Sequence, residues 1–490
     1  MLFNSFGFLV FFIVVTTLFF TIPNRFRWSL LLFASCFFYM FFKPEYILIL
    51  AFTIVVDYFA GILIESAEGQ KRKQFFLIMS LVANIGVLAV FKYYNFINDQ
   101  VTGIARLLGY ANHIPYLIWI LPIGLSFHTF QAMSYTIEVY RGNQKSERHF
   151  GIYSLYVMFY PQLVSGPIER PQNMLHQFHE EKHFSYENLF YGLQRIIWGI
   201  FKKVVIADRL AMMVDYIYKD PYPWHGLPIL LAVILFAFQI YCDFSGYSDI
   251  AVGTARVMGY KLMENFNYPF RSRNITEFWR RWHISLYSWF NDYLFTPVVI
   301  NKRAWGSWGV VFALLVTFSI SGLWHGANWT FILFGVLHGL AVSYEFLTKK
   351  YRKRWSKKLP VFLYGRLSIL ITFCYACITW IFFRSTSVHQ AVYMLKNLFK
   401  TNANGQYFYL GVAEIRGLPS TYMGLPFWQF AGSLMLIPFL FFSEWLLSGD
   451  NMNRFRTFPV YLRWAAFYII ILSVLILGVF DTKQFIYFQF

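Results

Sequence analysis

The sequence carries little charge for its length. Of its 490 residues, 13% are charged, whereas a soluble domain carries roughly 25%. Hydrophobic residues make up 58%, so a soluble chain of this composition would lack the polar surface to cover itself. No stretch between the apolar runs is long enough to form a soluble domain. We therefore expect a single membrane domain over residues 1–490, with lipid around its apolar exterior.

Acidic residues are scarce, 24 against 42 basic residues, which gives a formal net charge of +18. The basic residues stand in short clusters between apolar runs, which is typical of cytoplasmic loops and not of a nucleic-acid-binding surface. The strongest cluster is 348–358. Placing it in the cytoplasm puts five other basic loops on the same side. The long segment 385–425 and both ends of the chain are then predicted to face outward.

Motifs of soluble enzymes are missing: no nucleophile elbow, P-loop, HExxH or dinucleotide fingerprint occurs. Cysteines number four, and Cys374 and Cys377 form a CxxC spacing inside an apolar run without a nearby histidine or second pair. We interpret them as buried thiols. No metal cofactor is predicted, because no His, Cys or carboxylate cluster has ligand spacing. Residues 1–21 lack the features of a cleavable signal and are expected to form a retained helix.

The apolar runs predict an all-α polytopic membrane protein, with about 11–12 transmembrane helices and further re-entrant or interfacial helices around a central cavity. A span needs about 20 mainly apolar residues. Three interrupted stretches, 151–165, 248–258 and 285–300, are interpreted as re-entrant or interfacial, and 388–399 as an amphipathic surface helix. The predicted spans are 5–21, 28–42, 46–65, 75–91, 114–136, 189–206, 228–245, 307–323, 329–347, 362–384, 426–445 and 464–480.

His325 is the first candidate for chemistry, because polar groups at membrane depth are costly and are often functional. It stands between two apolar legs, 307–323 and 329–347, which both run back to basic loops. The segment is thus a predicted helical hairpin with His325 near its tip. Gly322 and Gly326 would permit a tight turn or a close approach by substrate. A histidine that only caps this turn is the alternative.

His283 is the second candidate and lies in a stretch rich in aromatic and basic residues, 274–286. In a helix, Arg280 and Arg281 would lie on turns neighbouring His283. Together with Arg273 and Arg271, these guanidinium groups would suit an anionic ligand such as the phosphate groups of a nucleotide. The alternative is an interfacial helix beside anionic lipid headgroups.

Other polar residues in apolar runs are weaker candidates. Asp243 and Asp249 need partners, which we expect among the basic residues of 271–281. They could position a histidine or brace the core, and we favour bracing. His128 and His338 lie inside predicted spans and could line a cavity. The remaining histidines lie in loops or at interfaces and are interpreted as solvated.

Six stretches together resemble the membrane-bound O-acyltransferase family, and in particular its alginate O-acetyltransferase branch. The chain length and the amphipathic segment after Ile381–Arg384 also fit this branch. In consistent order between about 120 and 345, the family core, the stretches are Leu121–Gln131, Pro161–Arg170, Asp243–Gly253, Asn265–Phe270, Phe278–Leu286 and Gly322–Trp329. The resemblance implies that His325, in Trp-His-Gly, is catalytic and that His283 supports it. His128 departs from the pattern, since an aromatic residue such as Phe is expected there.

The resemblance further implies the reaction. Acetyl-CoA is the implied donor on the cytoplasmic side, with Arg273, Arg280 and Arg281 as candidate contacts. O-acyl transfer needs a base for the acceptor hydroxyl, and a neutral imidazole with its ordinary pKa near 6.5 suits this. The implied acceptor is an extracytoplasmic polysaccharide, reached with a separate extracytoplasmic acetyltransferase as partner. The implied location is the bacterial inner membrane.

Two other functions remain open from the sequence. A D-alanyl or longer-acyl transferase for teichoic-acid-type polymers would use the same fold, with a carrier protein as the donor in the D-alanyl case. A polysaccharide exporter or flippase would need no catalytic histidine, but it would need a wide polar path with several intramembrane charges. The acceptor polymer is not specified by any motif.

Overall fold

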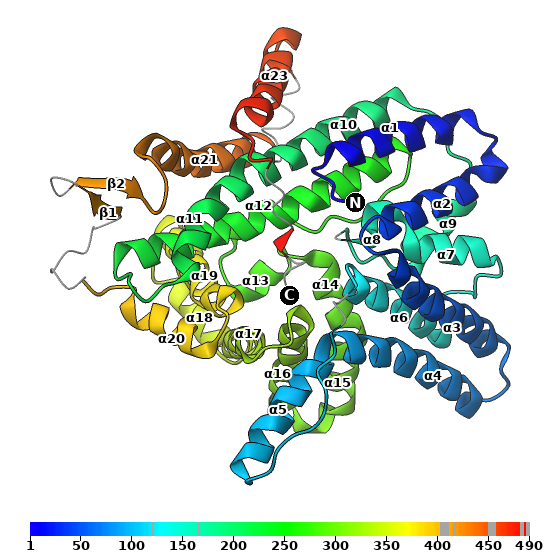
Figure 1. Ribbon diagram of the computed structural model, residues 1–490. Coiled ribbons are helices and arrows are strands. Elements are labelled where there is room, and N and C mark those ends of the chain that lie inside the picture. Colours follow the sequence, from blue (N-terminus) through cyan, green and yellow to red (C-terminus); the bar gives the residue numbers. More distant parts are fainter. Residues whose placement is uncertain are drawn as a thin grey trace. The chain divides into compact units, whose positions relative to one another are not determined.

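The computed structural model describes residues 1–118, 122–164, 166–401, 411–414, 418–448, 457–480 and 485–486. Helices dominate the described chain (Figure 1). The chain forms two compact units: unit 1 comprises Met1–Ile196 and Ser248–Glu264, and unit 2 comprises Ile197–Tyr247 and Asn265–Phe490. The all-α membrane fold expected from the composition is confirmed.

Unit 1 is held together by helices that share polar contacts inside an apolar core. Asp57 accepts hydrogen bonds from Ser80 Oγ at 2.5 Å and from Asn84 Nδ2 at 2.8 Å. His128 Nε2 lies 2.5 Å from Thr53 Oγ1, so this histidine links α3 and α6. The helices that lie wholly in unit 1 are α1 (Phe6–Thr21), α2 (Arg27–Met40), α3 (Ile47–Ser66), α4 (Gln70–Leu88), α5 (Tyr94–Leu107), α6 (Leu125–Arg141), α7 (Phe150–Met158), α8 (Tyr160–Leu163) and α9 (Pro171–His179).

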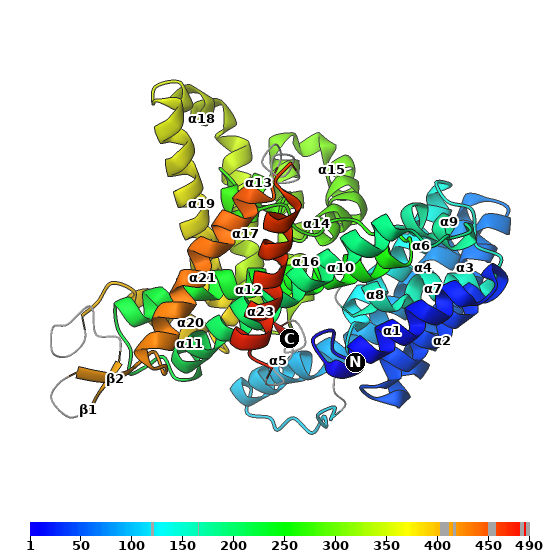
Figure 2. The ribbon, with the colours of Figure 1, turned by 90° about the horizontal axis from the view of Figure 1, so that it is seen from above.

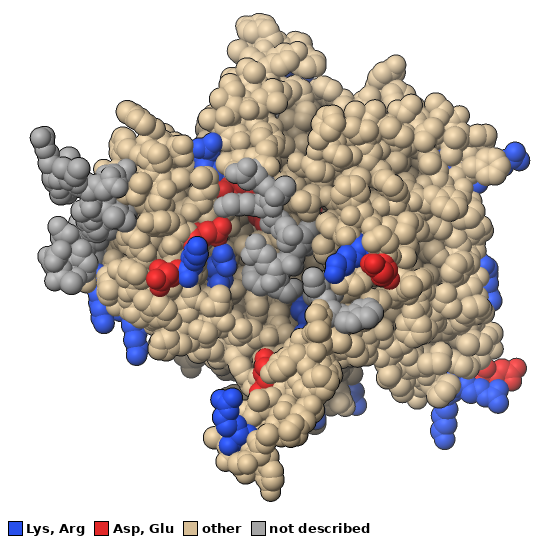
Figure 3. All heavy atoms as spheres, in the orientation of Figure 1, with Lys and Arg blue, Asp and Glu red and all other residues tan. Residues whose placement is uncertain are grey.

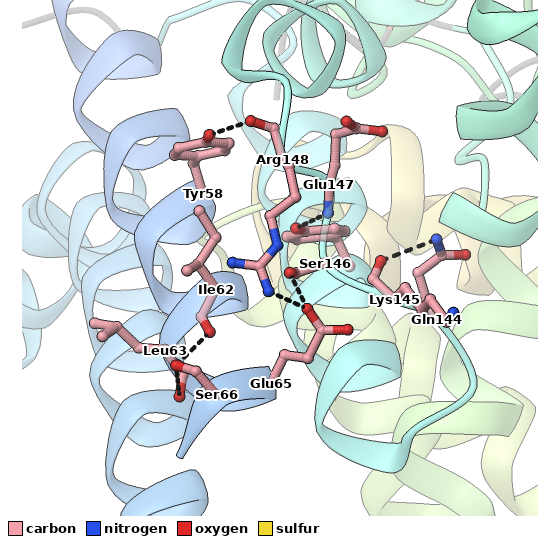
Figure 4. A network of polar contacts seen from close by, with 11 residues as sticks. Tyr58, Ile62, Leu63, Glu65, Ser66, Gln144, Lys145, Ser146, Glu147 and Arg148 are labelled. Atoms are coloured by element: carbon pink, nitrogen blue, oxygen red, sulfur yellow. Dashed lines mark hydrogen bonds and ion pairs between the residues drawn. The ribbon is translucent and has the colours of Figure 1, made fainter.

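The end of α3 is fixed to the loop that follows α6 (Figure 4). Glu65 accepts a hydrogen bond from Arg148 Nη2 at 2.7 Å and another from Ser146 Oγ. Tyr58 Oη donates to the backbone carbonyl of Arg148 at 2.6 Å. These contacts give the basic loop a defined conformation at the end of an apolar helix.

Two helices have residues in both units, α10 (Tyr186–Ile200) and α12 (Leu227–Val257), and α11 (Asp208–Lys219) lies between them in the sequence. A π-helical turn, Phe201–Ala207, joins α10 to α11. Within unit 1, a Cβ on Gly192 would collide with the backbone of Gly253, so the two glycines let α10 and α12 touch. The interpretation of 248–258 as re-entrant was wrong, because the helix begun at Leu227 continues without a break to Val257.

Unit 2 contains a helical hairpin and the helices packed on it. The helix α18 connects the end of α17 to the start of α19 (Figure 2) and contains most of the basic cluster 348–358. The amphipathic segment forms a helix, α20, as expected; a β-hairpin after it was not expected. Besides α11 and parts of α10 and α12, the elements are α13 (Ile275–Trp279), α14 (Ile284–Phe290), α15 (Thr296–Asn301), α16 (Ser307–His325), α17 (Trp329–Leu347), α18 (Lys349–Ser356), α19 (Val361–Arg384), α20 (Val388–Asn397), β1 (Gly411–Glu414), β2 (Leu418–Tyr422), α21 (Phe427–Leu446) and α23 (Val460–Leu477).

Each of the twelve predicted spans corresponds to a helix, but not all are long. Within the described residues, eight helices are long and apolar enough to cross a membrane. The helices α1, α2, α6 and α10 have 14 to 17 residues each. The span predicted at 114–136 was placed too early, because the left-handed Gly124 (φ 79°) precedes the start of α6 at Leu125.

Uncharged residues dominate the face of the molecule seen in Figure 3, where Lys, Arg, Asp and Glu occur in a few places. Large apolar side chains are exposed on many helices, for example Trp428 at 81% and Phe33 at 74%. Such a surface is unfavourable in water and favourable against lipid tails. The chain is a multi-pass membrane protein.

Candidate active site

The hairpin of α16 and α17 ends at His325, the last residue of α16. Asn328 begins α17: its Oδ1 accepts from Thr330 N at 3.0 Å, and its Nδ2 donates to the carbonyl of Thr386 at 3.1 Å. Each leg has 19 residues, or roughly 28 Å of helix. The predicted hairpin and the place of His325 at its tip are therefore confirmed.

Glycines bring the two legs of this hairpin into backbone contact. A Cβ on Gly322 would collide with the carbonyl oxygen of Phe331, and one on Gly335 with that of Phe318. Gly326 lies against the ring of Phe331 in the same way. These glycines thus serve helix packing, and they fix the position of His325 relative to α17.

His283 is held in a turn whose backbone is left-handed (φ 46°, ψ 53°), a conformation that is costly for a residue with a Cβ. Asn265 holds this turn in place: its carbonyl accepts from Ile284 N at 3.0 Å, and its Oδ1 accepts from Ser285 Oγ at 2.6 Å. Beside it, Phe266 and Trp282 form an isolated antiparallel bridge. Two of the recognised motifs, Asn265–Phe270 and Phe278–Leu286, therefore pair with each other and fix the position of His283.

The indole of Trp324 lies against both histidines. Its ring centroid is 5.1 Å from that of His325 and 6.1 Å from that of His283. Both histidines are buried, His325 at 4% and His283 at 0% exposure. The structure therefore brings together two residues that lie 42 positions apart in the sequence, around a tryptophan that the sequence analysis did not single out.

Aromatic rings make the walls around these histidines. Phe383 of α19 and Phe334 of α17 lie 5.3 Å and 6.0 Å from the ring of His325. Phe244 of α12 stands perpendicular to His283 at 4.6 Å. Apolar walls exclude water, which favours the attack of a hydroxyl on an activated acyl group over hydrolysis.

His338 is a third buried histidine in unit 2, and both of its ring nitrogens are occupied. Trp279 Nε1–H donates to Nδ1 at 3.2 Å. The hydroxyl of Thr379 donates to the carbonyl of Ala376, so its oxygen accepts from His338 Nε2–H at 3.0 Å. His338 is thus fixed as the neutral Nε2–H tautomer that joins α13, α17 and α19.

Comparisons with known proteins agree with this geometry. A model of MBOAT, the membrane-bound O-acyltransferase family, matches residues 149–392, which include both histidines. A protein described as "Probable alginate O-acetylase" from Pseudomonas aeruginosa is 36% identical over 401 residues, covering 81% of this chain and 75% of the relative. The chain belongs to the membrane-bound O-acyltransferase family.

Two further relatives of this O-acyltransferase carry different names. A peptidoglycan O-acetyltransferase from Helicobacter pylori is 34% identical over 402 residues, 76% of this chain and 73% of the relative. A teichoic acid D-alanyltransferase from Bacillus subtilis is 31% identical over 283 residues, 54% and 69% of the two chains. The family therefore supports an enzyme over the exporter considered from the sequence.

The arginines near His283 in this O-acyltransferase lie at the surface. Arg273 and Arg280 are exposed. Arg281 is half-buried and pairs with Glu277, with 3.0 Å between Nη2 and Oε1, and Glu277 also accepts from the backbone N–H of Arg273. Two residues of the predicted anion site are thus exposed, and the third is already paired with a carboxylate.

The partners expected for Asp243 and Asp249 were wrong. Lys203 Nζ lies 2.7 Å from Asp243 and 2.8 Å from Asp208, and all three side chains are buried in unit 2. In unit 1, Asp249 accepts from Arg195 Nη2 at 2.8 Å. The partners come from the polar residues of the helical run from α10 to α11. The sequence does contain a signal for a buried cation in this run, because Lys202 and Lys203 interrupt an apolar stretch.

The sequence analysis also missed a buried carboxyl in the motif Pro161–Arg170. Glu169 of unit 1 accepts from the backbone N–H of Met263 at 2.5 Å and is 1% exposed. Burial raises the pKa of Glu169 to about 7. It lines a cavity of about 450 Å³ together with polar residues that include Asn173, Lys182 and Lys261.

Proposed function

We propose that this enzyme transfers acetyl groups from cytoplasmic acetyl-CoA across the bacterial inner membrane for O-acetylation of an extracytoplasmic polysaccharide. The acceptor would be an alginate-like exopolysaccharide or a cell-wall glycan, as the names of the relatives suggest. The observation that carries the proposal is the pair of buried histidines around Trp324, with His325 at the tip of a membrane hairpin.

His325 acts as the base in this proposal. Its imidazole takes the proton of the acceptor hydroxyl while the oxygen attacks the thioester carbonyl. The C–S bond breaks, an ester bond forms, and the thiolate of coenzyme A leaves and takes up a proton. The rings of Trp324, Phe334 and Phe383 hold the imidazole and exclude water from the carbonyl.

His283 supports the reaction without carrying charge. Burial lowers the pKa of His283 to about 3, so its imidazole is neutral throughout the physiological range. A neutral imidazole has one donor and one acceptor nitrogen and can orient a substrate group through hydrogen bonds. We assign His283 this orienting role beside the base.

The donor is expected to bind where the basic residues of unit 2 reach solvent. Arg273 and Arg280 are exposed near the Glu277–Arg281 pair in the sequence, and the basic helix α18 follows α17. Phosphate groups of coenzyme A would bind such guanidinium groups. The acetyl end would then extend from this surface toward the buried histidines.

The polymer is expected to be acetylated with help from an extracytoplasmic acetyltransferase partner. Between α19 and α21, the described chain has only α20 and the β1–β2 hairpin, which is little surface for gripping a long glycan. We propose that this segment, within 385–425, faces outward and docks the partner.

The orientation can be tested with single cysteines at Lys353 and Lys396, after the four native cysteines are replaced. Both lysines are exposed, and α19, with 24 residues, separates them. We expect an impermeant thiol reagent added to intact cells to label Lys396→Cys and to leave Lys353→Cys unlabelled until the cells are opened. Labelling of Lys353→Cys alone in intact cells would reverse the topology.

Reconstitution in liposomes tests the proposed reaction. With acetyl-CoA inside and glycan outside, we expect acetylated glycan only when the partner is added outside. Carrier-bound D-alanine in place of acetyl-CoA serves as the competing donor, because a D-alanyltransferase is among the relatives. Transfer from that donor and not from acetyl-CoA would contradict the acetyl assignment, and transfer only when donor and glycan share one side would contradict outward transfer.

A further inference from the structure

Phe485 and Ile486 are buried in the core of unit 2, at 0% and 3% exposure. They follow α23, which is largely exposed along its length, so the chain returns from an apolar outer helix into the interior. The buried segment Phe485–Ile486 itself carries no charge, although Asp481 and Lys483 precede it in the sequence. Its contacts lead instead toward the candidate active site.

The backbone of this segment is fixed by a buried carboxylate. The N–H of Ile486 donates to Asp243 Oδ2 at 2.7 Å, while the other oxygen of Asp243 pairs with Lys203 at 2.7 Å. A backbone hydrogen bond to a buried charged group is stronger than a neutral one. The segment is therefore held at a defined point on α12.

The side chain of Phe485 continues toward His283. Its ring lies 4.4 Å from that of Tyr247 and 5.6 Å from that of Phe244. Phe244 in turn lies 4.6 Å from His283, at an angle of 88°. Phe485 thus packs behind Phe244, which forms one wall of the histidine site.

We propose that Phe485 is a positioning residue for acyl transfer: it holds Phe244 against His283 and closes this side of the site to water. The inference rests on the proposed role of His283. Removing the Phe485 ring would leave a cavity behind Phe244, since a packed core relaxes only partly. Phe244 could then move, and water could reach the acyl donor.

Removal of the Phe485 ring is therefore expected to increase hydrolysis of the acetyl donor relative to acyl transfer. When water attacks the thioester carbonyl, the C–S bond breaks and the products are acetate and the thiol of coenzyme A, without an ester on the acceptor. A general loss of folded enzyme would lower transfer and hydrolysis together. Entry of water into the site would lower transfer and raise hydrolysis. The ratio of the two rates therefore separates this cause from a loss of folded enzyme.

The test compares Phe485→Ala with Phe485→Leu in the full chain, with Phe480→Ala as the matched control, since Phe480 is 54% exposed. Acetyl-CoA is supplied with and without acceptor, and thiol release and ester formation are measured. We expect the ratio of transfer to hydrolysis to fall about tenfold or more in Phe485→Ala, to recover partly in Phe485→Leu, and to stay unchanged in Phe480→Ala.

A ratio in Phe485→Ala within twofold of wild type would overturn the inference while leaving the proposed function intact. If Phe485→Ala does not fold, the ratio in Phe485→Leu decides: a fall supports the inference and an unchanged ratio overturns it. A wild-type protein that cleaves no acetyl thioester would overturn the proposed function and this inference together.

Discussion

Replacement of His325 with alanine is expected to reduce acyl transfer by about 10²–10⁴-fold, the usual loss for a missing acid–base catalyst. The protein should remain folded, because the position of the hairpin depends on Gly322 and Gly335 and on the capping of α17 by Asn328. Acylation of the acceptor should be measured at equal amounts of membrane-inserted protein.

Two other histidines serve as controls for this variant. His113→Ala changes an exposed histidine and should retain wild-type activity. His283→Ala should cause a smaller loss than His325→Ala, since His283 orients and does not take the proton. Near wild-type acylation by His325→Ala would refute the catalytic assignment.

Replacement of Lys203 with methionine is expected to destabilise the protein by about 3–5 kcal/mol, the usual cost of removing one partner of a buried ion pair. Methionine fills a similar volume, but it leaves Asp208 and Asp243 buried without the cation that lies 2.7–2.8 Å from them. Thermal unfolding in detergent, followed by loss of monodisperse protein, measures the change.

The matched control is Lys219→Met, because Lys219 is an exposed lysine at the end of α11. It should change stability little, as is usual for surface substitutions. Adding Asp243→Asn to Lys203→Met should cost less than the sum of the two single changes, since the substitutions share one network. Additive losses would argue that the ion cluster is not coupled.

Hydropathy made most of the helices predictable, because a run of about 20 apolar residues is typical of a membrane-spanning helix. It placed α16, α17 and α19 within a few residues of their ends. It failed at α6, where the apolar residues of 114–118 lie outside the helix, and at the 248–257 part of α12, where small and polar residues suggested a break inside one continuous helix. Apolar character alone does not distinguish these cases.

Both histidines could be selected as candidates from the sequence: His325 is a polar residue between two apolar legs, His283 lies in an aromatic and basic stretch, and each stands within a recognisable motif. Trp324 and Phe244 could not, since in a chain with 22% aromatic residues no spacing marks one ring over another. The pairing of Asp243 with Lys203 was missed for a similar reason. The sequence shows that a buried charge needs a partner, but which residue becomes that partner depends on the fold.

The division of the chain between two units has a consequence for biosynthesis. Unit 1 needs Ser248–Glu264 as well as the first 196 residues, and Arg195 is matched there by Asp249 and Glu264. At about 5–20 residues per second, translation needs several seconds to pass from Ile196 to Glu264. During that interval the nascent chain carries an unmatched arginine on a half-built bundle. We therefore expect this cation to pair with lipid headgroups or to stay hydrated until the ribosome delivers its two carboxylates.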